Sequence, residues 1–184
     1  KNKFNFFLIF VVLISLISTF ISYRTYKSFV QAKIFTLHFN TREFDKVDQK
    51  YIDNLIVDLP NLSATVIPIK AIKASYLSYK SNPTMEEINL AKKYLKEAIK
   101  DNPFIKIPEA ELSKIYFLEE KKDSAIYYGK LAFEGIKKNP IHFAHYVAAL
   151  ASVGDTATIR NIYENLKYKD FLIDKLYLTA MTEL

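Results

Sequence analysis

An uncharged run of 19 residues near the N-terminus, from Phe4 to Ser22, constrains this chain more than any other feature of its sequence. At about 1.5 Å per residue, a helix over this run is roughly 28 Å long, close to the ~30 Å thickness of the hydrocarbon core of a bilayer. The polar residues inside the run are small or uncharged, and a helix tolerates such side chains in lipid. The run therefore predicts a membrane-spanning helix over residues 1–23.

A cleaved signal peptide and a buried helix of a soluble protein are the alternatives for this run. Lys1 and Lys3 fit the basic start of a signal peptide. However, no pair of small residues with cleavage spacing follows the run, which is also longer than the usual apolar core of such a peptide. A membrane anchor is the better interpretation. Because the sequence begins with Lys1 and not with Met, we expect a trimmed chain or a piece of a longer one.

Basic residues are concentrated beside the predicted anchor. Residues 1–42 contain six basic residues and no acidic one, and the 20 basic residues that follow balance all 20 acidic ones. The body thus has no excess charge with which to follow a phosphate backbone, which argues against a nucleic-acid partner. The cations after the run suit anionic lipid headgroups, and the candidates are Arg24, Lys27 and Lys33. By the positive-inside rule, they predict a bacterial inner-membrane protein whose C-terminal part lies in the cytoplasm.

The rest of the sequence predicts an all-α fold, because it has only three glycines and few strand signals. Helical periodicity and helix-boundary residues predict three helix pairs and a last helical segment. Their expected ranges are 66–80 with 86–100, 108–119 with 123–137, 141–152 with 156–167, and 170–182.

Residues 24–63 are expected to form a juxtamembrane basic helix and a degenerate helical hairpin. The first helix should continue to about Phe39, and Thr41 is a candidate N-cap for a second helix that runs to about Asp58. The apolar residues that predict an amphipathic first helix are Tyr26, Phe29, Val30, Ile34 and Leu37.

Residues 64–184 carry a pattern of small and aromatic residues at helix crossings. In Glu109–Gly135, the first helix has Leu112, Ser113 and Tyr116, and the second has alanines at two small positions. This unit resembles a tetratricopeptide repeat (TPR), and the unit before it carries the second-helix pattern. The resemblance implies an α-solenoid of TPR-like hairpins, with a generic array of helical hairpins as the alternative. The pattern departs from the family where no Trp occurs and where large residues occupy small positions: Val147, Ile159 and Leu166.

A second, weaker resemblance covers the anchor and the segments that follow it. The apolar helix, the stretch YRTYKSF (Tyr23–Phe29), the stretch DLPNLSA (Asp58–Ala64) and the degenerate repeats look like the C-terminal tail of O-antigen ligase/polymerase-type membrane proteins. In that family the chemistry lies in membrane helices and extracytoplasmic loops upstream of such a tail. No catalytic residue carries over to this chain.

Candidate chemistry is sparse in the sequence. His142 and His145 are three residues apart on one predicted helix, without a third metal ligand nearby, so we interpret them as surface and packing histidines. The acidic pairs fit helix dipole and capping roles or solvated charge: Glu86–Glu87, Glu109/Glu111 and Glu119–Glu120. No serine has a G-x-S-x-G context, and the glycines do not permit a phosphate-binding loop. We therefore predict no enzyme, no metal and no cofactor in this segment.

The TPR resemblance implies a concave groove lined by the first helix of each pair. In that register the groove residues are Ser75, Tyr79, Lys114, Phe117, His145 and Ala148. Such a lining suits an extended or helical peptide with apolar anchors. The sequence therefore predicts a membrane-anchored scaffold or assembly factor that binds a protein partner. Two alternatives remain open: the tail of a polysaccharide-assembly enzyme, and a soluble helical enzyme.

Overall fold

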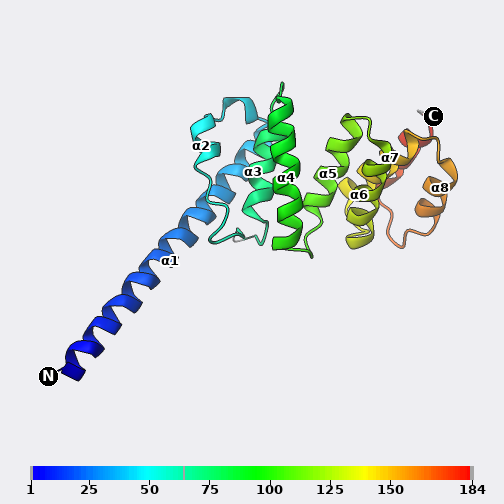
Figure 1. The fold of residues 1–184 in the computed structure, drawn as a ribbon. Coiled ribbons are helices and arrows are strands. Elements are labelled where there is room, and N and C mark those ends of the chain that lie inside the picture. Colours follow the sequence, from blue (N-terminus) through cyan, green and yellow to red (C-terminus); the bar gives the residue numbers. More distant parts are fainter. Residues whose placement is uncertain (1, 64, 183–184) are drawn as a thin grey trace.

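The computed structural model describes residues 2–63 and 65–182, and the regular structure in these ranges is helical, as predicted (Figure 1). The helices are α1 (Asn2–Thr41), a 3₁₀ helix η1 (Phe44–Lys46), α2 (Gln49–Asp53), α3 (Ile69–Ser78), α4 (Met85–Asp101), α5 (Ile107–Leu118), α6 (Lys122–Gly135), α7 (Pro140–Ala151), α8 (Thr156–Glu164) and α9 (Phe171–Thr182).

Helix α1 projects from the body with its N-terminal half free of contacts (Figure 1). The apolar side chains of this half are about half exposed or more, from Phe6 at 73% to Ile21 at 50%. The described helix is long and apolar enough to cross a membrane, which agrees with the length of the uncharged run.

The face of α1 that packs against the body is not the apolar face predicted from the sequence. Tyr26, Phe29 and Leu37 are exposed, whereas Ser28 and Gln31 are buried. Ala32 is also buried on this face, and Phe35 packs beside it. The contact face of α1 thus mixes small, polar and aromatic residues, which the hydrophobic periodicity of the sequence does not reveal.

The predicted second helix from Thr41 to Asp58 is wrong. The Thr41 hydroxyl donates to the Leu37 carbonyl (3.0 Å) inside the last turn of α1, and Arg42 turns the chain in a left-handed conformation (φ 58°). Phe44 is then buried, stacked on Tyr79 with ring centroids 5.1 Å apart. Burying this ring bends the chain back after α1, so only η1 and the five-residue α2 form before α3.

The body consists of consecutive helices packed side by side. Helix α3 packs on α4 and α5 on α6, while α4–α5 and α6–α7 contacts join the pairs. The ends of α3–α8 lie within a few residues of the predicted ones. Local signals explain several starts: Thr84 and Glu87 form a capping box for α4, and Pro108 lies in the first turn of α5. The last predicted pair differs, because α7 packs more extensively on α9 than on α8.

The connections between helices lie along two opposite edges of the body (Figure 1). We call the edge formed by residues 57–63, 65–68, 102–106, 136–139 and 165–170 the basal edge. The apical edge is formed by residues 42–48, 79–84, 119–121 and 152–155. Helix α1 leaves past the basal edge, where the Ser28 hydroxyl donates to the Leu62 carbonyl (3.2 Å). Its C-terminal end meets the apical edge, where the Ser81 N–H donates to Asp45 (2.8 Å).

Candidate functional site

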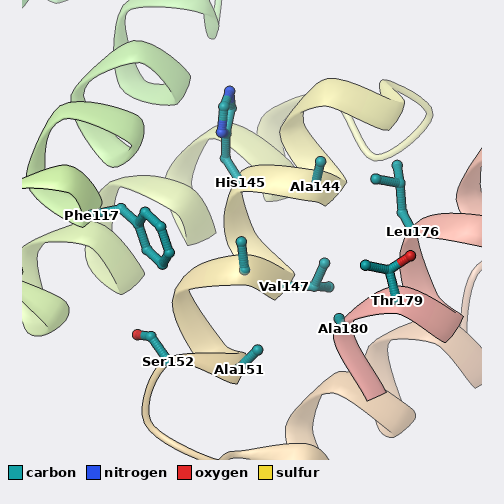
Figure 2. Close-up of a pocket in the computed structure, with 10 residues that line it drawn as sticks. Phe117, Ala144, His145, Val147, Ala151, Ser152, Leu176, Thr179 and Ala180 are labelled. Atoms are coloured by element: carbon teal, nitrogen blue, oxygen red, sulfur yellow. The ribbon is translucent and has the colours of Figure 1, made fainter. Parts of the chain in front are cut away.

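Two cavities lie along the face formed by α3, α5 and α7. The first, of about 290 Å³, lies between α1, α3, α5 and the start of α7. The second, of about 380 Å³, lies between α5, α7 and α9. Figure 2 shows α7 in the middle of the second cavity, with Phe117 of α5 on one side and Leu176, Thr179 and Ala180 of α9 on the other. We call the two cavities together the groove.

A polar cluster lies at the centre of this face. The Tyr79 hydroxyl donates to Glu111 Oε1 (2.7 Å), and Lys114 Nζ lies 3.6 Å from the centroid of the Tyr79 ring. Glu111 Oε2 is buried and accepts no hydrogen bond from the described residues. The cluster therefore combines a cation held by an aromatic face with an enclosed carboxyl group.

Burial governs the protonation of this cluster. It raises the pKa of the Glu111 carboxyl, against the opposing effects of the Tyr79 hydrogen bond and the Lys114 charge. It lowers the pKa of Lys114, where Glu111 opposes the shift and Arg42 adds to it. The pKa of Tyr79 is raised, first by burial and then by the adjacent Glu111. Desolvation thus disfavours the charge on each group, so a ligand that restores hydrogen bonds here gains more than it would in water.

The two histidines of α7 lie on the same side as this cluster. The His142 ring is buried and its Nδ1 lies 3.1 Å from the Ala132 carbonyl, so it packs as expected. Burial, followed by the charges of Lys114 and His142, lowers the pKa of His145 to about 4. His145 is therefore a neutral imidazole near pH 7 and can accept or donate one hydrogen bond at the edge of the second cavity.

Four of the six predicted groove residues line one of the two cavities. Ser75 lines the first cavity, although its hydroxyl donates to the Ala71 carbonyl (3.1 Å) of its own helix. Phe117, His145 and Ala148 line the second cavity. Tyr79 and Lys114 line neither of the two cavities and form the polar cluster with Glu111. Along α5, Lys114 stands between Glu111, which lines the first cavity, and Phe117, which lines the second.

Sequence reasoning missed three contributors to the groove. Phe35 and Phe39 of α1 form a wall of the first cavity, and α9 forms one side of the second. Glu111 was interpreted as a helix-start charge, yet its partner is the Tyr79 side chain, 32 residues away. Glu109 is likewise buried and pairs with Lys106 (2.9 Å). The Glu109 pair is local in sequence, but the contributions of α1, α9 and Glu111 have no local signal, because each depends on a helix that is distant in sequence.

The three predicted headgroup residues differ in their surroundings. Arg24 is half-buried and its Nε donates to the Leu59 carbonyl (2.6 Å). Lys27 is exposed and lies over the Tyr23 ring at 5.8 Å. Lys33 is exposed and lies about 16 Å beyond Ser22 along the axis of α1.

Within residues 2–63 and 65–182, no three His, Asp or Glu side chains gather to hold a metal ion. Comparison with known proteins finds no matching family model, no similar curated protein and no matching solved structure.

Proposed function

We propose that this chain is a membrane-anchored, non-catalytic binding module whose groove holds a segment of a partner protein. One observation carries the proposal: two cavities lie along the aligned helices α3, α5 and α7, separated by a polar cluster. Cavities of this size each accommodate one or two apolar side chains. The polar cluster between them fixes the register of the bound segment.

The bound segment should have two apolar anchors flanking an acidic or carbonyl group. The first cavity is lined mainly by aromatic and aliphatic side chains, and the second by Phe117, alanines and Leu176. Lys114 lies between them, and burial lowers its pKa. Burial removes water from the Lys114 ammonium group and so disfavours its charged form. A negatively charged group or a strong hydrogen-bond acceptor of the bound segment, placed beside Lys114, would take the place of that water and stabilise the charge.

Close helix crossings support a TPR-like construction of the body. The alanines at the predicted small positions of α4 and α6 are fully buried: Ala91, Ala98, Ala125 and Ala132. Small residues at these crossings let successive pairs stack, as in helical repeat proteins.

A random peptide library tests the groove directly. Full-length protein in lipid nanodiscs should enrich peptides with two spaced apolar residues. Ala148→Arg, which fills the second cavity, should abolish that enrichment. Ala157→Arg places the same side chain on the exposed surface of α8 and should leave the enrichment intact. Enrichment that persists in Ala148→Arg, or that never exceeds empty nanodiscs, would refute the proposal.

We further propose that α1 spans the bilayer and that the body lies in the cytoplasm. The six basic residues of segment 1–42, placed on both sides of the uncharged run and mostly after it, support this orientation. Because the chain has no cysteine, Asn82→Cys at the exposed apical edge provides a unique label site. A membrane-impermeant maleimide should modify it only after the cells are permeabilised. Labelling in intact cells would place the body outside.

A further inference from the structure

We propose that the basal edge of the body lies against the bilayer surface, with the aromatic tips of its connections in the headgroup layer. The partner of this surface is a lipid membrane that contains anionic headgroups. The inference rests on the proposed spanning role of α1. It adds a second membrane contact, made by the folded body and distinct from the groove.

The first argument is that no linker separates the predicted span from the body. The Arg24 side chain already donates to the Leu59 carbonyl (2.6 Å), and Ser28 donates to Leu62 (3.2 Å). Arg24 follows Ser22 by two residues, or about 3 Å along the helix. The interfacial layer of a bilayer is about 5 Å or more thick on each side. The segment around Leu59 therefore lies at the depth of the headgroups when α1 spans the membrane.

The second argument is the placement of exposed aromatic side chains. Phe104 is 86% exposed at the tip of the 102–106 connection, and Tyr168 is 49% exposed in the 165–170 connection. Phe171, at the start of α9, is 84% exposed. Leu59 adds an aliphatic side chain at 54% exposure on the same edge. At or beside the apical edge, the large exposed apolar residues are Met85, Leu118 and Val153, and the exposed aromatic side chain of Phe117 (40%), next to Leu118, lines the second cavity. Aromatic residues favour the membrane interface, so the two edges differ in the way that a bilayer contact requires.

The third argument is charge. The basal connections present exposed lysines, and the apical connections are rich in acids. The basal lysines are Lys137, Lys138, Lys167 and Lys169, opposed in these connections by Asp58 and Asp170. The apical acids are Glu43, Asp45, Asp48, Glu119, Glu120 and Asp155, opposed in these connections by Arg42, Lys46, Lys80 and Lys121. The apical connections thus have a net charge of −2, and the basal ones, counting the half-buried Lys106, a net charge of +3. An anionic surface attracts lysines and repels acids, so the basal edge, which has the positive net charge, is the one that turns toward lipid.

The orientation of α1 is compatible with this contact. Helix α1 runs obliquely to the other helices (Figure 1), so laying the whole basal edge on the surface tilts α1 in the bilayer. Membrane helices tilt by about 20° on average, within a range that reaches about 40°. Tyr23, Tyr26 and Phe29 are exposed in the turns of α1 that follow Ser22, where aromatic side chains favour the headgroup layer beside Arg24 and Lys27.

The absence of tryptophan from the chain permits a sharp test. Single substitutions place one tryptophan at the basal edge (Phe104→Trp or Tyr168→Trp), the apical edge (Leu118→Trp or Val153→Trp) or the span (Phe10→Trp). Each full-length variant is reconstituted into vesicles of phosphatidylcholine with about one third phosphatidylglycerol, with or without brominated phosphatidylcholine as quencher. Leu118 (71%) and Val153 (46%) are exposed to a degree similar to Phe104 (86%) and Tyr168 (49%).

We expect bromolipid to quench Phe10→Trp most strongly and both basal probes at least about twofold more than their apical counterparts. Replacing the four basal lysines with glutamine should reduce basal quenching and leave Phe10→Trp unchanged. Strong quenching of Phe10→Trp together with equal, weak quenching at both edges would overturn the basal contact while the anchor stands. Weak quenching of Phe10→Trp would refute the anchor and the basal contact together.

Discussion

The hairpin of α5 and α6 and the following pair, α7 and α8, are built from similar segments but pack differently. In the first pair, the buried Ser113 hydroxyl donates to the Ala125 carbonyl of the facing helix (2.8 Å). A Cβ added to Gly129 would lie 2.9 Å from Ser113 Oγ and 3.1 Å from Tyr146 Cα. In the second pair, Val147 and Ile159 occupy positions where small residues were expected. Ile159 is the one buried residue among the nine of α8.

The difference shows that residue size at a crossing decides how closely two helices pack. Close packing also compensates for missing helix caps: α5 and α6 begin without a side-chain cap, at Lys106 and Lys121. By contrast, Asn139 caps α7 and Asp155 caps α8. Where few side chains are buried, the cap contributes a larger share of the helix's stability.

The largest expected effect comes from breaking the close crossing. Gly129→Leu should destabilise the body by about 3 kcal/mol or more, because the new side chain meets the Tyr146 backbone, which cannot move without displacing α7. Thermal unfolding of the solubilised protein, followed by circular dichroism, measures the loss.

Gly135→Leu is the matched control for that change. A Cβ at Gly135 meets the side chain of Lys106 and no backbone atom, so Gly135→Leu should cost less than Gly129→Leu, and its cost should come from displacing Lys106 from the buried Glu109. Equal losses in the two variants would mean that backbone proximity at Gly129 is not what holds α5, α6 and α7 together.

A second prediction concerns the loosely packed pair. Ile159→Ala should cost about 2–4 kcal/mol. Because it removes the single buried side chain of α8, the loss should appear as local opening of that helix. Leu112→Ala in α5 should cost a similar amount but open the whole body. Amide hydrogen exchange distinguishes the two patterns, and the comparison fails if Ile159→Ala accelerates exchange in α5 and α6 as much as in α8.

A third prediction concerns the junction of the two pairs, where His145 faces the Lys114 charge. The pKa of His145 is lowered to about 4 from 6.5, so the unfolded chain binds more protons than the folded chain between these values. Stability should therefore fall as the pH drops from 6.5 toward 4. His142, whose pKa is also lowered, acts in the same direction.

His145→Gln tests this linkage. The variant should show a flatter dependence of the denaturant midpoint on pH across this window than the wild type. Parallel curves for the two proteins would show that His145 does not couple protonation to folding.

These comparisons show how much of the structure could be predicted from the sequence alone. Caps, prolines and periodicity are local, so the ends of α4–α7 could be predicted closely, as Thr84 and Pro108 illustrate. The packing face of α1 could not, because its apolar face is exposed and its buried face includes Ser28 and Gln31.

The groove was only partly predictable for the same reason. A repeat register identifies positions such as Phe117 and Ala148 from their own segments. It does not show that Glu111 meets Tyr79 or that α1 supplies Phe39 to a cavity wall. Those contacts depend on Phe44 turning the chain after α1, a tertiary event without a local pattern.

The smallest expected effect tests the cap of α8. Asp155 Oδ1 accepts from the Thr158 N–H (3.0 Å), and hydrogen bonds from the Thr158 hydroxyl and N–H lower the carboxyl pKa below 3.8. The stabilisation is thus present above that value and lost as the pH falls through the folded-state pKa. Asp155→Ala should speed amide exchange in α8 by less than Ile159→Ala does, and only while the wild-type carboxyl is ionised. Asp123→Ala, in the first turn of the uncapped α6, should leave exchange in its well-packed helix nearly unchanged. If Asp123→Ala instead has the larger effect, caps do not compensate for weak packing in this protein.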